Sequence, residues 1–335
     1  MKDPSISIII PTYNSSKTIK RCINSFIYQL SSIDSILIID DNSIDNTMDL
    51  ISDLDFKNLF FYKNPKTGPN SARNFGIEKS KTDYLMFVDS DDYLEEGAIK
   101  KIKQNIILSE SDILILGYSF TVNSKIVKSS SLSNSKFISS KKNILEIGFT
   151  SSYYSSVCWN KVIKATILKK NKNVRLIEDR IHGRDSIFVK ELSLIAKNIL
   201  FLDGVQYISV ITTNSFSRSF SLRNVNSSLD CIQKLINLKN KNNIPTEIIF
   251  KSITKIMIYI IFYSAIRLNY KSFKKAVFLI YDKLKNFLKN YKFVSEMKDI
   301  KNLFNFIIIF LSFKLDFLVF ISFRIAKKMK LIVDY

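Results

Sequence analysis

The chain has 335 residues, 46% of them hydrophobic, and its 50 basic and 30 acidic side chains give a net charge of +20. This length allows one large domain or two of ordinary size, and the apolar share is sufficient for a buried globular core. The sequence contains three scattered cysteines, no CxxC pair and one histidine. This pattern excludes a zinc-finger type of site and fits a reducing compartment.

The charge is unevenly distributed along the chain. Residues 1–120 hold 13 basic and 17 acidic side chains and are net −4, whereas residues 121–335 hold 37 and 13 and are net +24. A basic half favours an anionic partner, which is a nucleic acid, an acidic membrane surface or a phosphorylated substrate. No signal peptide is visible at the start of the sequence, so we expect a cytoplasmic protein.

Apolar runs and helical patterns alternate through the first third of the chain. In order, the pattern predicts a strand at 5–10, a helix at 17–30, a strand at 35–39, a helix at 47–54, a strand at 59–62, a helix at 70–79 and a strand at 84–88. This alternation is typical of an open α/β sheet with mostly parallel strands. In such sheets, ligands bind at the carboxyl ends of the strands.

The remaining sequence is less regular. It predicts a helix at 96–104, a strand at 113–120, a polar loop at 124–140, a helix at 160–170 and a helical region from 227 onward. We expect no internal repeat, because no segment of the sequence recurs.

An Asp-Ser-Asp triplet follows the strand expected at 84–88. Asp89 and Asp91 are separated by one residue, so both carboxylates can face the same divalent ion or its water shell. Mg²⁺ and Mn²⁺ prefer oxygen ligands and use one or two carboxylates together with substrate phosphates. The alternative is an Asp-rich turn that caps the next helix. In the context of the other strand ends, the triplet predicts a metal site that neutralises charge on a departing pyrophosphate.

Three more polar positions lie at the same predicted edge. Asp41 follows the second strand and can accept hydrogen bonds from a base or ribose, or can form an Asx turn. Tyr13 follows the first strand, where its ring can stack on a base or be partly buried. Arg73 lies in the first turn of the third helix, where its guanidinium can pair with a phosphate or with Asp89.

Four segments of the sequence together resemble family-two glycosyltransferases with the GT-A fold. They are SISIIIPTYN at 5–14, IIDDNSIDNT at 38–47, GPNSARNFGI at 68–77 and YLMFVDSDDYL at 84–94. The resemblance covers residues 5–97 and continues weakly to about residue 220. It implies a nucleotide-diphospho-sugar transferase with a Rossmann-like, mostly parallel sheet, a sugar-nucleotide donor, and inversion of the anomeric centre.

The resemblance also implies roles for individual residues on the donor side. Pro11 and Tyr13 correspond to the segment that lines the base, and Asp41 corresponds to the acidic residue at the uracil edge. Arg73 corresponds to a basic residue near the uridine. Asp91 corresponds to the direct ligand of Mn²⁺ or Mg²⁺, with Asp89 nearer the ribose.

A second acidic site is expected on the acceptor side. In the family, a Trp-Asn-Lys segment precedes it, and this chain has that segment at 159–161. Asp185 matches the position of the catalytic base, although Arg184 stands where an acidic residue is usual. The pair Glu178 and Asp179 is the alternative. It matches the family less well, because no Ile-Phe pair follows it as Ile-Phe follows Asp185. A carboxylate base is needed because a sugar hydroxyl is a poor nucleophile at neutral pH.

Two further side chains near this site have open roles. Trp159 can stack on a sugar or belong to the core. His182 can touch the acceptor or a phosphate, or lie in a loop near the pocket.

The resemblance and the charge pattern together predict the organisation of the chain. We expect a GT-A domain at 1–225, with a donor half at 1–120 and an acceptor half at 121–225, and a basic helical region at 226–335. The apolar stretch 303–323 and the basic cluster that follows it predict docking on an anionic membrane surface. A buried helix and a membrane span are the alternatives.

The predicted function is transfer of a sugar from a UDP-sugar to a hydroxyl of a surface-glycan precursor, free or linked to a lipid. The protein would then be peripheral on the inner face of the cell membrane.

The alternatives are another nucleotide sugar or a basic nucleic-acid-binding protein. We expect no nucleic-acid partner, because the N-terminal part is net negative and no nucleic-acid motif is present. No GxGxxG follows the first strand, which disfavours a dinucleotide oxidoreductase. The sequence also lacks the QxxRW-type segment of a processive membrane synthase.

Overall fold

A computed structural model describes residues 3–178, 185–211 and 221–290. The described chain divides into two compact units. The first contains all the strands with helices α1–α7, and the second contains helices α8–α10. The domain boundary expected at residue 225 stays a prediction, and helix α8 runs through that position.

The strands of the first unit are short. They are β1 (Ile6–Thr12), β2 (Ser35–Asp40), β3 (Leu59–Lys63), β4 (Tyr84–Phe87), β5 (Tyr93–Leu94), β6 (Ile113–Ile115), β7 (Tyr118–Val122), β8 (Lys125–Ser130), β9 (Lys136–Ile138), β10 (Lys161–Lys164), β11 (Ile199–Phe201) and β12 (Tyr207–Val210).

The helices alternate with these strands. They are α1 (Ile19–Asn24), α2 (Pro69–Lys79), α3 (Ala98–Ser109), α4 (Lys141–Thr150), α5 (Ser152–Ser155), α6 (Ala165–Lys170) and α7 (Asp185–Ile195), with 3₁₀ turns η1 (Ile27–Gln29) and η2 (Asp49–Ile51). The second unit has α8 (Leu222–Asn242), α9 (Thr246–Arg267) and α10 (Tyr270–Asn290).

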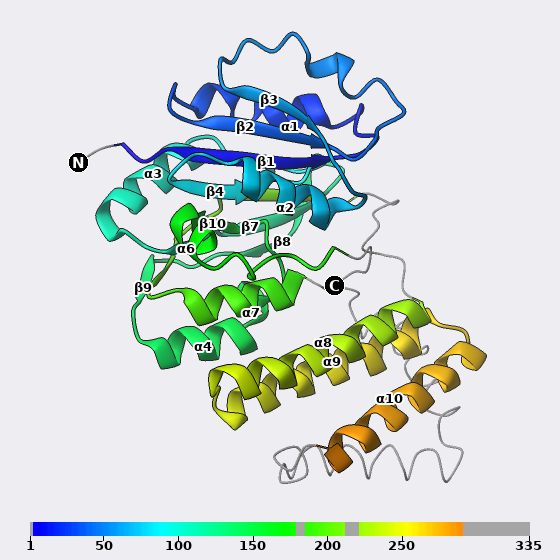
Figure 1. The fold of residues 1–335 in the computed structure, drawn as a ribbon. Helices are drawn as coiled ribbons and strands as arrows, with labels where there is room; N and C mark the ends of the chain where they lie inside the picture. Colours follow the sequence, from blue (N-terminus) through cyan, green and yellow to red (C-terminus); the bar gives the residue numbers. More distant parts are fainter. Residues whose placement is uncertain (1–2, 179–184, 212–220, 291–335) are drawn as a thin grey trace. The chain divides into compact units, whose positions relative to one another are not determined.

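The main sheet has the strand order β3-β2-β1-β4-β10-β6-β11-β9 in the described residues. Strands β3, β2, β1 and β4 are parallel and lie in this order from the top of Figure 1. Strand β10 runs antiparallel to both of its neighbours. This arrangement confirms the predicted α/β fold; the sheet, expected to be mostly parallel, is mixed, with four parallel strands followed by antiparallel pairs at β10 and β9.

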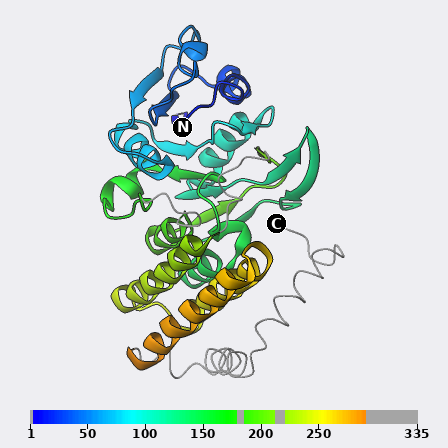
Figure 2. The ribbon, with the colours of Figure 1, turned by 90° about the vertical axis from the view of Figure 1, so that its right-hand side faces the viewer.

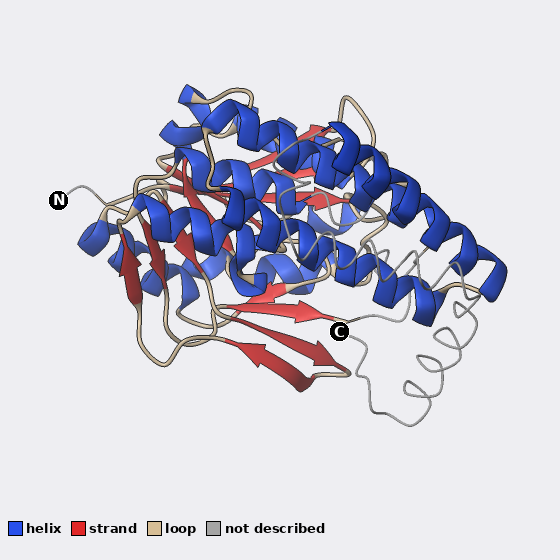
Figure 3. Ribbon diagram, turned by 90° about the horizontal axis from the view of Figure 1, so that it is seen from below, coloured by secondary structure: helices blue, strands red, loops and turns tan. Residues whose placement is uncertain are grey.

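Both faces of the main sheet are buried. Ile8 of β1 packs with helices α1 and α3 on one face, and Ile9 packs with helices α2 and α7 on the other. Successive side chains of a strand point to opposite faces, so a strand covered on both sides must be apolar throughout. This explains the isoleucines at positions 6, 8, 9 and 10 of β1. The polar side chain among them, Ser7, is buried but hydrogen-bonded to the hydroxyls of Ser35 and Thr82. The helices that cover the sheet are blue in Figure 3.

A second sheet has the order β5-β12-β7-β8 in the described chain. The chain passes from the main sheet into this sheet at Gly117, between β6 and β7. A side chain at Gly117 would meet the carbonyl oxygen of Gly204, so the two backbones can approach only because residue 117 is glycine. The sequence predicted one strand at 113–120, and this break is a correction to it.

Three other sequence predictions need correction. The region 124–140 is not a loop, because it contains β8 and β9. The turn before β8 has positive φ at both Asn123 and Ser124, as two-residue hairpins require, but it lacks the Asn-Gly signal. The helix expected at 160–170 begins as strand β10, which inserts between β4 and β6. The helix expected at 47–54 is reduced to η2.

Helices α8, α9 and α10 of the second unit pack against one another, and Figure 2 shows them as long rods. They confirm the predicted helical region as far as residue 290, where the described residues end. Among the described residues, α9 is long and apolar enough to cross a membrane by length and composition alone, with a mean hydropathy of 1.6. Because 44% of its most apolar 18-residue stretch is buried inside the structure, a packed core helix explains the apolar composition of α9 equally well. The stretch 303–323 lies outside the described residues.

Helix α2 lies unusually close to β1. A Cβ atom at Gly76 would lie 2.3 Å from Ile9 Cγ2, so this helix position accepts only glycine at the present spacing. The close approach sets the depth at which α2 presents its other side chains at the edge of the sheet.

We therefore predict that Gly76→Ala lowers the free energy of unfolding by about 1–3 kcal/mol, the usual cost of overpacking a core. Chemical denaturation would measure the loss. Ile9→Ala provides the control, because it removes the clashing atom at its own cost. The double variant should then lose less than the sum of the two single variants. Strict additivity would contradict the close-approach explanation.

Candidate active site

Hydrogen bonds join the carboxyl ends of β1, β2 and β4. The Asp41 amide donates to the Thr12 carbonyl oxygen at 2.7 Å, which connects the ends of β2 and β1. The hydroxyls of Ser15 and Ser90 are 2.7 Å apart and connect the segments after β1 and β4. The three clusters that the sequence placed after separate strands therefore lie at one edge of the sheet.

The segment after β4 carries a cluster of three carboxylates. Asp89 Oδ1 accepts a hydrogen bond from Arg73 Nη2 at 2.6 Å and forms an ion pair with it. Asp92 is almost fully buried, and its carboxylate accepts hydrogen bonds from the Tyr207 hydroxyl at 2.8 Å and the Val210 amide at 2.7 Å. Asp91 lies between them and is half-buried.

Burial and mutual repulsion disfavour negative charge in this cluster. Burial, together with the charge of Asp89, raises the pKa of Asp91 to about 6. Burial also raises the pKa of Asp92 well above its usual range, and the charges of Asp89 and Asp91 add to the effect. Groups that resist ionisation in this way are suited to a nearby cation.

The residues present fit a divalent metal at Asp91 and Asp89. Two carboxylate side chains lie one residue apart after a strand, and negative charge on one of them, Asp91, is disfavoured; oxygen ligands of this kind are those that Mg²⁺ and Mn²⁺ prefer. Within the described residues, no group of three or more Asp, Glu, His and Cys side chains forms a complete protein-only site. An ion here would therefore take its other ligands from substrate phosphates or water.

Arg73 is buried at the start of α2. Its Nη1 donates to Asn70 Oδ1 at 2.8 Å, its Nη2 pairs with Asp89, and its Nε has no hydrogen-bond partner among the described residues. It also lies within electrostatic range of Asp185. Arg73 is therefore a fixed positive charge between the two acidic positions.

The other predicted donor residues differ in accessibility. Tyr13 is 57% exposed after β1, so its ring is accessible to a ligand, whereas Pro11 is buried within β1 beside Ile39. The Asp41 carboxylate accepts hydrogen bonds from the Gly68 amide at 2.8 Å and from Asn64 Nδ2 at 2.7 Å. It thus holds the loop before α2, and its contact with a base stays a prediction.

Asp185 opens helix α7. Its Oδ2 accepts a hydrogen bond from the Cys158 thiol at 3.2 Å. The alternative base Glu178 is instead engaged by Lys66 Nζ at 2.6 Å and by Asn74 Nδ2 at 3.1 Å. Asp179, His182 and Arg184 lie outside the described residues.

Two residues at this edge were not found from the sequence. Tyr207 accepts a hydrogen bond from the Asp89 amide at 3.1 Å while it donates to Asp92, so it joins β12 to the acidic cluster. The Arg21 guanidinium donates to the Asp91 carbonyl oxygen. Neither residue belongs to a local motif, because both reach the cluster only through the tertiary fold.

Trp159 is a core residue. It is 7% exposed and stacks on Tyr207 at a ring-centroid distance of 4.5 Å. Its edge contacts with Tyr118 and Phe120 complete an aromatic cluster beneath the acidic segment. The structure therefore supports a core role for Trp159 rather than stacking on a sugar.

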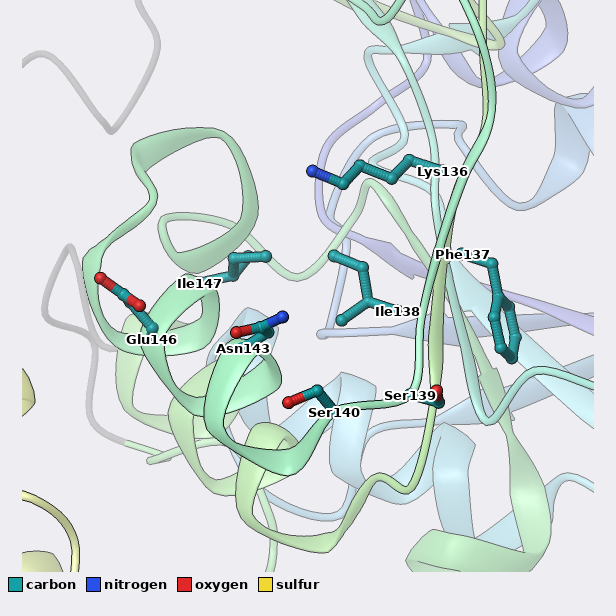
Figure 4. A pocket seen from close by; sticks show the side chains of 8 residues that line it. All are labelled: Lys136, Phe137, Ile138, Ser139, Ser140, Asn143, Glu146 and Ile147. Carbon is teal, nitrogen blue, oxygen red and sulfur yellow. The ribbon is translucent and has the colours of Figure 1, made fainter.

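A hollow of about 420 Å³ lies elsewhere in the first unit, between β9 and α4. In Figure 4, Lys136 and Ile138 point toward α4, and Phe137 points to the opposite side of the strand. None of the predicted site residues lines this hollow.

Comparison with known proteins identifies the family. Residues 7–159 match the model of glycosyl transferase family 2. The poly(ribitol-phosphate) β-N-acetylglucosaminyltransferase TarP of Staphylococcus aureus is 30% identical over 229 residues, which cover 67% of each protein. The chain therefore belongs to glycosyltransferase family 2.

Other comparisons define the extent of the similarity. Glycosyltransferase GlyA of Streptococcus pneumoniae is 24% identical over 73% of this chain, but the match spans 36% of GlyA. The crystal structure of S. aureus TarS 1–349 in complex with UDP-GlcNAc has a TM-score of 0.73 at 18% identity. That match covers 97% of this chain and 92% of TarS 1–349 and confirms the GT-A fold.

We predict that Asp91→Asn stabilises the metal-free protein at neutral pH. The folded-state pKa of Asp91 is raised, so its contribution to stability is highest at low pH and decreases as pH rises through about 6. Removal of the charge should raise the free energy of unfolding at pH 7.5 by about 1–2 kcal/mol, after allowance for partial solvent screening.

Urea denaturation in a chelator at pH 7.5 and pH 4 would measure this gain. It should largely disappear at pH 4, where the wild-type carboxyl is protonated. The exposed Asp55→Asn is the matched control and should change stability little at either pH. A destabilised Asp91→Asn protein, or a gain independent of pH, would contradict the assignment.

Proposed function

We propose that this protein is an inverting glycosyltransferase that moves a sugar from a UDP-sugar to a hydroxyl of a surface-glycan precursor. The observation that carries the proposal is the arrangement of Asp89, Asp91 and buried Arg73 at the carboxyl end of β4. In a family-2 fold, this edge combines two oxygen ligands for a cation with a fixed positive charge for a phosphate.

The comparisons support the class of donor. TarP is named for transfer of N-acetylglucosamine, and the TarS structure contains UDP-GlcNAc. In this chain, the exposed ring of Tyr13 is suited to stack on a base, and Arg73 is suited to pair with phosphate. A different nucleotide sugar is the alternative, because donor choice depends on the shape of the pocket.

Asp91, with Asp89, would hold Mn²⁺ or Mg²⁺ in this proposal. When bound, such an ion neutralises negative charge on the departing nucleoside diphosphate. Arg73 contributes a second, permanent positive charge beside Asp89. Because its guanidinium is held by Asn70, it needs little reorganisation during the reaction.

Asp185 is the proposed base. The acceptor hydroxyl would transfer its proton to this carboxylate as its oxygen forms a bond to the anomeric carbon. The bond from that carbon to the phosphate oxygen breaks at the same time, and its electron pair leaves with the nucleoside diphosphate. One displacement of this kind inverts the configuration and needs no covalent intermediate.

The acceptor class is a glycan or a lipid-linked glycan. The named acceptor of TarP is a poly(ribitol phosphate), and its phosphates make it an anionic polymer. The +24 net charge of residues 121–335 is compatible with a phosphorylated acceptor or with its lipid carrier. Nucleic-acid binding, the alternative expected from charge alone, receives no support from the family.

A membrane surface is the second proposed partner. One face of α10 exposes four lysines and one aspartate around Phe278, which is 61% exposed; they are Lys271, Lys274, Lys275, Lys285 and Asp282, so the face is net positive. Aromatic and basic side chains that share one helix face are typical of a helix that lies in a membrane interface. We therefore propose that α10 contributes to peripheral attachment at the cytoplasmic face of the cell membrane.

We predict that turnover of a UDP-sugar requires Mn²⁺ or Mg²⁺. It should also require the carboxylates of Asp91 and Asp185, each at a different step. Asp91→Asn should lose metal-dependent UDP binding together with transfer. Asp185→Asn should keep the dissociation constant for UDP but reduce transfer by about 10²–10⁴-fold, the usual contribution of a positioned base. Calorimetry with UDP, and UDP release from a panel of nucleotide sugars, would measure the two effects.

Glu178→Gln is the control for the base, since Glu178 is engaged by Lys66 and Asn74. It should retain most of the transfer activity. Full activity in chelator would rule out the metal role. Loss of transfer in Glu178→Gln with retention in Asp185→Asn would exchange the two assignments.

We also predict binding to vesicles that contain phosphatidylglycerol at low salt, with release at high salt. The triple variant Lys274→Glu/Lys275→Glu/Phe278→Ser should bind at least about tenfold more weakly, because each basic residue near an anionic surface adds about 1 kcal/mol. Co-sedimentation would measure the partitioning, with neutral vesicles as a blank. Lys125→Glu/Lys136→Glu, two exposed lysines in the first unit, should leave binding nearly unchanged. Equal binding of the triple variant and the wild type would rule out α10.

A further inference from the structure

Cys158 is in direct contact with the proposed base. It lies between α5 and β10, and its side chain is fully buried. Its Sγ lies 3.2 Å from Asp185 Oδ2. This hydrogen bond connects two segments that are 27 residues apart in the sequence.

The direction of this hydrogen bond follows from the environment of the thiol. Burial raises the pKa of Cys158 well above its usual range, and this effect outweighs the lowering by Arg73; the nearby Asp185 carboxylate raises it further. The thiol therefore keeps its proton at neutral pH. It is the donor, and the Asp185 carboxylate oxygen is the acceptor.

The backbone around Cys158 is held in place by a neighbouring lysine. Lys161 Nζ donates to the Val157 carbonyl oxygen at 2.6 Å and to Asn160 Oδ1 at 2.7 Å. Lys161 is itself fully buried and lies over the ring of Tyr154 at 4.9 Å from its centroid. Lys161 therefore closes the turn from 157 to 161. This fixes the backbone position from which the Cys158 side chain extends.

Within the part of the chain that the structure describes, the Cys158 thiol is the one hydrogen-bond donor to the Asp185 carboxylate. Asp185 belongs to α7 (Asp185–Ile195). A carboxylate in this position rotates about two side-chain torsions. A base must present one oxygen to the acceptor hydroxyl in a narrow range of positions, so a bond to the other oxygen has a direct catalytic consequence.

We propose that Cys158 is a positioning residue for Asp185, whose thiol holds Oδ2 so that Oδ1 accepts the proton of the acceptor hydroxyl. This inference rests on the proposed function of Asp185. In the reaction, the proton moves from the acceptor oxygen to Oδ1, and the thiol proton stays on sulfur. Cys158 therefore undergoes no covalent or redox change.

The test compares Cys158→Ala, Cys158→Ser, Asp185→Asn and the double variant Cys158→Ala/Asp185→Asn. Cys158→Ala should lower kcat for sugar transfer about tenfold, the effect of losing one hydrogen bond to a charged group, and leave the dissociation constant for UDP unchanged. Cys158→Ser retains a donor and should recover most of kcat. The double variant should be no slower than Asp185→Asn, because the thiol acts only through Asp185.

Cys231→Ala is the matched control, since it removes a buried thiol in the second unit. It should leave kcat unchanged. If Cys158→Ala retains wild-type kcat while Asp185→Asn loses it, the positioning role is overturned and the proposed function stands. If Asp185→Asn retains transfer, the proposed base is wrong and the positioning role fails with it.

Two further outcomes would also overturn the proposal. A loss of kcat that Cys158→Ser does not restore, together with a lower melting temperature, would indicate that Cys158 only packs the core. A double variant that is slower than Asp185→Asn by the same tenfold factor would show that the thiol acts independently of the carboxylate.

Discussion

The ion pair between Arg73 and Asp89 is the interaction on which the rest of this site depends. The Arg73 side chain is 8% exposed and the Asp89 side chain 28%, so both charges have lost much of their hydration. Removal of either partner would leave an unpaired charge in a poorly solvated place, which is far more costly than loss of an exposed pair. The pair also joins the start of α2 to the end of β4, so the helix and the acidic segment form one structure.

The backbone makes this pair possible. Gly76 allows α2 to approach β1 closely, and the Asp41 carboxylate holds the loop that leads into the helix. On the other side, Tyr207 supports the acidic segment through both Asp89 and Asp92. These contacts hold the three carboxyl groups of the acidic segment close together. Their burial and mutual repulsion disfavour ionisation, which is why the pKa values of Asp91 and Asp92 are raised.

The proposed acceptor side, around Asp185, has a different construction. Asp185 stands at the start of α7, and its contacts come from the turn between α5 and β10. Strand β10 lies beside β4 in the main sheet, so this turn and the acidic segment after β4 belong to neighbouring strands. Arg73 lies within electrostatic range of both acidic groups. The proposed donor and acceptor sides therefore share one buried cation, Arg73.

The sequence by itself determined the α/β class, the first four strands and the residues at their carboxyl ends. Apolar runs such as SISIII and the short polar clusters after them are local patterns, and their meaning does not depend on distant segments. The tertiary structure alone decided that 124–140 forms strands, that β10 enters the main sheet, and that Tyr207 and Cys158 reach the acidic groups. Those features arise from pairings between residues far apart in the chain, and such pairings leave no periodic signal in the sequence.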